Sequence, residues 1–187
     1  MLLEQAEVML REGGVDGLSL RELARQAGVS HGAPRSHFID RQALLDALAE
    51  QGFDRFAEKI THALATRGTL EQRFRRVGRA YVDFAVDDAA LMDLMFAAKT
   101  IDPAGPVGDA ANRLFGVLDG AIGSATTTPA DAGARTRFKL LFAATMQGTA
   151  TLIAAQRITR RQGEVIVDDA TAMLLASPLG SMVVPPV

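Results

Sequence analysis

The 187-residue chain contains no cysteine and no tryptophan, and it has a single tyrosine. Without cysteine, a disulfide framework and all cysteine-based zinc or redox sites are excluded. No stretch approaches the roughly 20 uninterrupted apolar residues of a membrane-spanning helix. The N-terminal region carries Glu4 and Glu7 and no basic segment, so it does not resemble a secretory signal. We therefore expect a cytoplasmic protein with no membrane partner.

Patterns typical of catalysis and metal binding are also missing. The first two of the three histidines (His31, His37 and His62) are six residues apart, which places them on different sides of a helix. The sequence holds no nucleophile–base pair, no metal-ligand cluster and no phosphate-binding glycine loop. We expect neither an enzyme nor a bound metal or other cofactor.

What the sequence does have is nearly continuous helical periodicity. Apolar residues make up 48% of the chain and recur at helical spacing, whereas alternating strand-like runs are scarce. The pattern predicts an all-α protein of about nine helices. A first helix ends at Gly13-Gly14, and three short helices follow up to residue 51. Longer ones are expected at about 53–66, 69–86, 89–99, 107–124, 129–159 and 165–176.

Residues 19–38 carry the local signals of a helix-turn-helix. Ser19 followed by Glu22 fits the S-x-x-E capping box at the start of a helix, and Gly28 supplies the tight turn that ends it. Ser30 is placed to cap a third, short helix running to about residue 38, and Asp40 to cap a fourth. This predicts a pair of short helices joined by a glycine turn.

Positive charge is concentrated in this segment, although the chain as a whole is not basic. The formal net charge is −2, and residues 1–50 hold five arginines, no lysine and eight acidic residues. Residues 19–42, however, carry four arginines against only Glu22 and Asp40. A local excess of this kind is the electrostatic footprint of a small DNA-reading unit.

The polar face of the third helix is expected to meet DNA. Gly32 and Ala33 are small enough for close approach, and Arg35 suits either a guanine edge or a phosphate. Ser19 and Arg21, at the start of the preceding helix, are placed to contact backbone phosphate. The predicted DNA-binding set is Ser19, Arg21, Ser30, His31, Gly32, Ala33, Arg35, Ser36, His37 and Arg41.

Three basic side chains here have a structural alternative. His37 is expected to be half-buried against the adjacent helix, with phosphate contact second. For Arg41, the sequence favours two roles equally: a charge on the helix surface and a phosphate contact. Arg25 is interpreted as a solvated surface residue.

The run Leu20-Arg-Glu-Leu-Ala-Arg-Gln-Ala-Gly-Val-Ser30, followed by His31-Gly-Ala-Pro-Arg-Ser-His-Phe38 and Ile-Asp-Arg-Gln-Ala-Leu-Leu45, resembles the helix-turn-helix of the TetR family of one-component repressors. The resemblance covers residues 2–50. Arg35 stands where the family usually has a phosphate-contacting tyrosine, and the usual basic arm before the first helix is absent. In one subgroup a tryptophan and a His-Gly pair mark the long helix; the tryptophan is missing here, and Gln147-Gly148 stands near the His-Gly position.

The resemblance implies an N-terminal three-helix helix-turn-helix domain (1–50) and a C-terminal helical ligand-binding and dimerisation domain (51–187). It implies a homodimer on a palindromic double-stranded DNA operator, released by a small, apolar effector. The last two helices would form the dimer interface. The 129–159 segment combines a core stripe that includes Leu141 with a second surface of alanines. It therefore needs partners on two sides, either the other subunit or the rest of its own chain.

Apolar residues in the second region line an effector pocket or simply form the core, and the sequence leaves both readings open. Methionine suits adaptable apolar sites, and Tyr81 and Gln147 are the predicted polar contacts. The predicted ligand-binding set is Val77, Tyr81, Phe84, Met92, Met95, Phe96, Phe115, Leu118, Phe142, Met146 and Gln147.

A second function fits the same sequence. The acidic balance of residues 1–50 and the missing basic arm are also compatible with a helical protein that binds a small molecule, a lipid or another protein and has a degenerate DNA-binding domain. Operator binding separates this alternative from the repressor.

Overall fold

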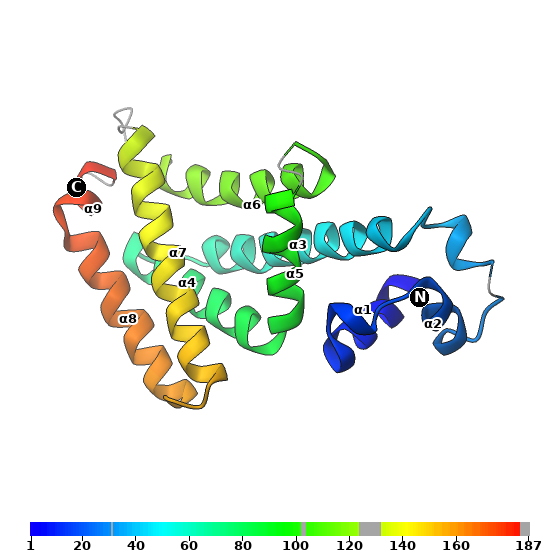
Figure 1. Cartoon of the computed structure of the whole chain (residues 1–187). Coiled ribbons are helices and arrows are strands. Elements are labelled where there is room, and N and C mark those ends of the chain that lie inside the picture. Colours follow the sequence, from blue (N-terminus) through cyan, green and yellow to red (C-terminus); the bar gives the residue numbers. More distant parts are fainter. Residues whose placement is uncertain (31, 102–103, 124–131, 184–187) are drawn as a thin grey trace. The chain divides into compact units, whose positions relative to one another are not determined.

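The computed structural model describes residues 1–30, 32–101, 104–123 and 132–183 (Figure 1). These residues form nine α-helices and two 3-10 helices, and they contain no β-strand. The all-α prediction is confirmed. Within the described ranges, no helix is long and apolar enough to cross a membrane.

The N-terminal region contains α1 (Leu2–Gly13), η1 (Val15–Gly17), α2 (Leu20–Gln26) and η2 (Pro34–Ser36). Gly14 and Gly28, which follow the two α-helices, have φ values of +65° and +67°. Glycine adopts this left-handed conformation without the steric cost that other residues meet. Both predicted helix ends are therefore confirmed.

The two helices expected on either side of Gly52 are one helix. α3 (Arg41–Ala65) runs unbroken for 25 residues, so the prediction of two separate helices is wrong. A Cβ on Gly52 would lie only 2.7 Å from the Sδ of Met95 on α5 (Ala89–Ile101). Gly52 thus allows α3 and α5 to approach closely, at a helix-propensity cost of about 1 kcal/mol relative to alanine.

The remaining helices are α4 (Leu70–Asp87), α6 (Pro106–Gly123), α7 (Ala132–Ala154), α8 (Arg160–Ala176) and α9 (Pro178–Val183). α8 begins five residues earlier than expected because Thr159 and Gln162 form a capping box at its start. The Ser177-Pro178 pair does end α8, as expected, but it also starts the short helix α9, in which Ser177 Oγ accepts a hydrogen bond from the Gly180 N–H. The first residues of the helix expected at 129–159 lie outside the described residues.

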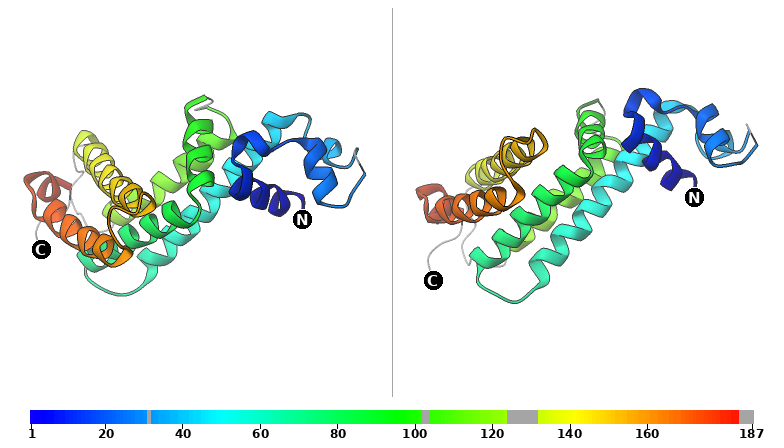
Figure 2. Two further views of the ribbon diagram at one scale, coloured as in Figure 1. Left: turned by 60° about the horizontal axis from the view of Figure 1, so that its bottom comes forward. Right: turned by 90° about the horizontal axis from the view of Figure 1, so that it is seen from below.

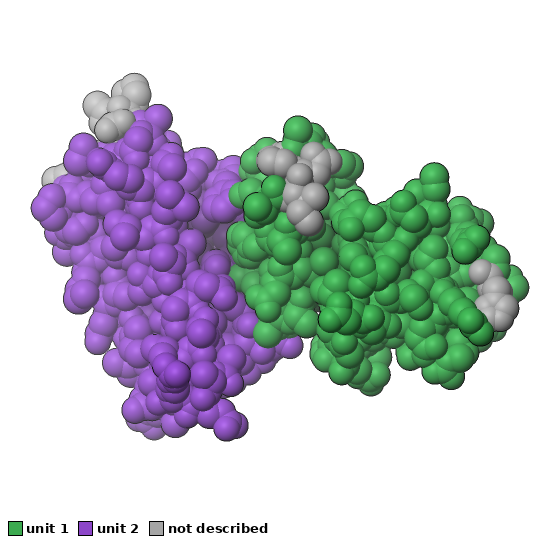
Figure 3. All heavy atoms as spheres, viewed as in Figure 1, with its two compact units in different colours: residues 1–55, 88–113 green, residues 56–87, 114–187 purple. Residues whose placement is uncertain are grey.

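The chain divides into two compact units, coloured separately in Figure 3. Unit 1 consists of residues 1–55 and 88–113, and unit 2 of residues 56–87 and 114–187. Residues 41–55 of α3 belong to unit 1 and residues 56–65 to unit 2.

Unit 1 contains a network of four charged side chains. Glu7 and Arg11 of α1 form an ion pair, and each also contacts a residue from another part of the unit. Arg55 Nη1 lies 2.7 Å from Glu7 Oε1, and Arg11 Nη2 lies 2.9 Å from Asp88 Oδ1. Arg55 and Asp88 close the network at 3.0 Å. Both carboxylates are about five-sixths buried, so the network joins α1 to α3 and to the residue before α5.

Unit 2 is built on the mutual packing of α4, α7 and α8, which lie side by side in Figures 1 and 2. A Cβ on Gly78 of α4 would lie 2.7 Å from Val167 of α8 and 2.9 Å from Met146 of α7, so the three helices approach closely at this glycine. Phe74 of α4 makes edge-to-face contacts with Phe138 and Phe142 of α7, the preferred geometry of aromatic pairs.

Candidate DNA interface

The start of α2 is fixed by the predicted cap. Ser19 Oγ accepts a hydrogen bond from the Glu22 N–H at 3.1 Å. The carboxylate of Glu22 does not return to Ser19, so only half of the expected capping box forms. It accepts hydrogen bonds from Arg25 and Gln26 instead, and these, Arg25 foremost, lower the pKa of Glu22 to about 2. Arg25 is 68% exposed and paired within its own helix, in agreement with its interpretation as a solvated residue.

The segment expected to form a third α-helix is much shorter in the structure. Among the described residues of this segment, only Pro34–Ser36 is helical, as the 3-10 helix η2, so the prediction of a third α-helix running to about Phe38 is wrong in type and length. Proline has no N–H, and its ring clashes with the carbonyl four residues earlier, here that of Ser30. The backbone N–H groups of Arg35 and His37 accordingly bond three residues back, in the 3-10 pattern.

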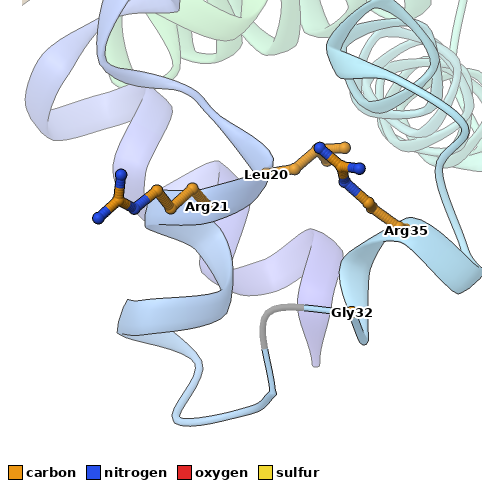
Figure 4. A pocket seen from close by; sticks show the side chains of 4 residues that line it. All are labelled: Leu20, Arg21, Gly32 and Arg35. Atoms are coloured by element: carbon orange, nitrogen blue, oxygen red, sulfur yellow. The ribbon is translucent and has the colours of Figure 1, made fainter.

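Two arginines remain available at this surface. Arg21, in the first turn of α2, and Arg35, in η2, are both exposed, and neither forms a hydrogen bond or ion pair with any other part of the chain that the structure describes. Together with Leu20 and Gly32 they line one open hollow of about 580 Å³. Figure 4 shows the Arg35 side chain extending from η2 toward Leu20, whereas the Arg21 side chain extends from α2 in the opposite direction. Two unpaired guanidinium groups beside one hollow form a site suited to a phosphate backbone.

Arg41 is engaged elsewhere. Its Nε–H donates to the carbonyl oxygen of Leu18 at 2.7 Å, and its Nη2–H donates to the carbonyl oxygen of Val15 at 2.6 Å. Neither role considered from the sequence, surface charge or phosphate contact, included these backbone bonds. A bond between residues 23 and 26 positions apart leaves no local sequence signal.

The other predicted DNA-contacting residues are mostly accessible. Ser30, Gly32, Ser36 and His37 are exposed, and Ser19 and Ala33 are half-buried. The expectation that His37 is half-buried is therefore wrong, since its neighbour Phe38 supplies the buried ring instead. His31 lies outside the described residues.

The predicted ligand-binding residues fall into both units. Met92, Met95 and Phe96 belong to unit 1, where Met95 packs over Gly52, and the other eight belong to unit 2. Phe96, Phe115, Leu118 and Gln147 are half-buried, and the remaining seven are buried. The structure thus gives most of this set a place in the core.

The two predicted polar contacts, however, meet each other. Tyr81 Oη donates a hydrogen bond to Gln147 Oε1 at 3.1 Å, and burial raises the pKa of Tyr81 to about 12. The Phe56 ring lies 5.2 Å from that of Tyr81 and stacks on Phe84 at 4.7 Å. Phe56 was not among the predicted residues, although its apolar spacing in α3 with Phe53 and Ile60 is visible in the sequence.

An open hollow lined by two arginines beside a short helix pair fits a helix-turn-helix protein, and comparison with known proteins identifies the family. Residues 2–48 match the model of the bacterial regulatory proteins of the tetR family. Residues 74–176, more than half of the chain, match the tetracyclin repressor-like C-terminal domain. The chain belongs to the TetR family. It is a DNA-binding transcriptional regulator and so not an enzyme.

Three relatives show how far the likeness extends. A protein of unknown function from Rhodococcus sp. RHA1 is 38% identical, with 92% of this chain and 91% of that chain aligned and a TM-score of 0.82. The class A tetracycline repressor from Escherichia coli is 48% identical over 56 residues, which are 30% of this chain and only 24% of that repressor. The regulator LfrR from Mycobacterium smegmatis, solved with proflavine, is 23% identical over 94% of this chain and 92% of its own, with a TM-score of 0.65.

Proposed function

We propose that this protein is a ligand-responsive repressor that binds a palindromic operator as a homodimer. Residues 1–50 would form the DNA-binding domain and residues 51–187 the effector-binding and dimerisation domain, acting in the cytoplasm where the DNA lies. The observation that carries the proposal is the hollow between α2 and η2, flanked by the unpaired guanidinium groups of Arg21 and Arg35. In the complex, these groups would contact phosphates and fix the position of η2 in the major groove.

The dimer proposal rests on an apolar stripe of unit 2, defined as Leu140 and Leu141 of α7 and Val165 and Met173 of α8. These side chains are between 49% and 70% exposed. The opposite sides of both helices face α4 at Gly78, so the stripe points away from the core of the unit. Several large apolar side chains exposed on two helices that pack together point to an interaction surface. Leu141, which the sequence placed in the core, is accounted for by this surface.

The effector proposal rests on the Tyr81–Gln147 hydrogen bond. A small, mainly apolar effector would lie against the aromatic side chains of Phe56 and Phe84 and would compete for, or extend, this polar contact. It would release DNA only if it binds one arrangement of the dimer more tightly than the other.

Operator binding is the decisive experiment. The purified protein is incubated with fragmented genomic DNA, and the retained fragments are sequenced. We expect a small set of fragments sharing one palindrome, and no enrichment by the double variant Arg21→Ala/Arg35→Ala. If the natural protein retains no fragment above background, the degenerate-domain alternative is correct and the repressor proposal fails.

The salt dependence of binding then tests Arg35. Fluorescence anisotropy with the recovered palindrome should show that Arg35→Ala weakens binding and lowers the slope of log affinity against log salt. The slope should fall by about 0.9 for each phosphate contact, or about 1.8 for two copies per dimer. Arg35→Lys, which keeps the charge, should retain most of the slope. An unchanged slope in Arg35→Ala would assign Arg35 to a base edge instead.

Tyr81 offers a direct measurement because it is the chain's only tyrosine. Absorbance at alkaline pH should show ionisation near pH 12 in the folded protein and near pH 10 after denaturation. The unfolded state therefore loses its proton first, and stability should decline as the pH rises from about 10 to about 12. A folded-state midpoint near pH 10 would contradict the buried position of Tyr81.

A further inference from the structure

Arg41 contacts the chain at the point where the reading segment begins. Its guanidinium bonds the carbonyl of Leu18, whose next residue, Ser19, caps α2. It also bonds the carbonyl of Val15, the first residue of η1. The first residue of α3 is thereby tied to both ends of the loop that leads into α2.

The bonding geometry requires a guanidinium. Arginine presents its N–H donors in a planar fork, so Nε and Nη2 reach two acceptors at once, whereas the lysine ammonium is a single point charge on a flexible stem. Both acceptors are backbone carbonyls, and bonds from a charged donor to such groups are among the stronger ones in proteins.

The same arrangement occurs at the other end of α3. In unit 2, Arg76 of α4 donates to the carbonyls of Ala63 and Thr66, at 3.1 and 2.6 Å, and Arg73 of α4 donates to the carbonyl of Leu64 at 2.9 Å. Guanidinium groups that donate to backbone carbonyls at the end of a helix or turn therefore occur more than once in this chain. The Arg41 bonds are of the same kind.

We propose that Arg41 is a positioning residue and not a phosphate contact. By holding the carbonyls of Val15 and Leu18, it fixes the Ser19 cap, and with it the Arg21 side chain, relative to the start of α3. Arg41 acts on DNA affinity only through these residues. The effect on affinity rests on the proposed DNA-binding function, whereas the effect on the loop does not.

The proposal predicts that replacement by lysine has a different effect at Arg41 than at Arg35. A phosphate contact tolerates lysine because the charge is kept, but the two-carbonyl contact does not. Arg41→Lys should therefore resemble Arg41→Ala, and Arg35→Lys should resemble the natural protein. The matched pair Arg35→Lys and Arg35→Ala serves as the control.

The first measurement needs no DNA. Hydrogen exchange of the peptide covering residues 15–22, followed by mass spectrometry, should be faster in both Arg41 variants and unchanged in both Arg35 variants. The second measurement is binding to non-specific duplex DNA at low salt and to the recovered palindrome. We expect Arg41→Lys to bind the palindrome about tenfold more weakly, the loss of roughly one charge-assisted hydrogen bond, with an unchanged salt slope.

The proposal would be overturned if Arg41→Lys exchanged residues 15–22 at the natural rate and bound the palindrome with natural affinity, while Arg41→Ala showed a reduced salt slope. Arg41 would then be a phosphate contact. If the natural protein binds neither duplex, the repressor proposal fails, but the exchange rates still decide whether Arg41 holds the loop.

Discussion

A chain carrying Leu141→Glu on α7 and Met173→Glu on α8 is expected to be monomeric and to bind the operator about 100-fold more weakly, or worse. In a symmetric dimer, each glutamate would be buried without a partner, and burying an unpaired charge is strongly unfavourable. The monomer would engage one half-site at a time, and it would lose the gain of about 100-fold to 10,000-fold that linked binding supplies.

Light scattering after size-exclusion chromatography measures the mass, and anisotropy on the palindrome measures the affinity. The matched control is Leu141→Met/Met173→Leu, which keeps the stripe apolar and nearly constant in volume. It should remain a dimer with natural affinity. A glutamate variant that is still dimeric and binds normally would show that the subunits meet elsewhere on the chain.

Replacing Phe56 by alanine is expected to lower the free energy of unfolding by about 3–5 kcal/mol. The ring is 1% exposed, stacks on Phe84 at an interplanar angle of 14°, and meets Tyr81 edge to face. Alanine leaves a cavity that these neighbours fill only in part. Because water gains access to the site, the pKa of Tyr81 should also fall from about 12 toward its ordinary value.

Urea unfolding at a fixed chain concentration gives the stability, since the midpoint of a dimer depends on concentration. Phe56→Leu should lose less than Phe56→Ala because it leaves a smaller cavity. Ile39→Ala, at a side chain that is 88% exposed, should stay within about 0.5 kcal/mol of the natural protein. A loss below about 1 kcal/mol in Phe56→Ala would mean that the aromatic contacts are not formed in solution.

The local features of the fold follow from the sequence. Ser19 at the start of α2 and the glycines after α1 and α2 act through bonds and backbone angles within a few residues, so their positions could be recognised without a structure. Helical periodicity predicted the all-α class for the same reason. The family resemblance of residues 2–50 was confirmed because it rests on this local pattern.

Features that depend on contacts between distant residues could not be recognised from the sequence. Gly52, inside α3, leaves room for Met95, which is more than forty positions away in the sequence. Only the folded chain shows that Arg25 is paired with Glu22, whereas Arg21 and Arg35 have no partner among the residues that the structure describes.

The sequence by itself therefore determined the family, the helices with local caps and the segment proposed to read DNA. Short-range hydrogen bonds and the 3.6-residue helical period depend on residues that are close together in the sequence, so they can be recognised there. Tertiary structure alone decided that Arg41 bonds the carbonyls of Val15 and Leu18, that Tyr81 meets Gln147, and that Leu141 lies on an exposed stripe. These contacts join residues that are far apart in the sequence and are brought together by the fold, so the sequence pattern does not predict them.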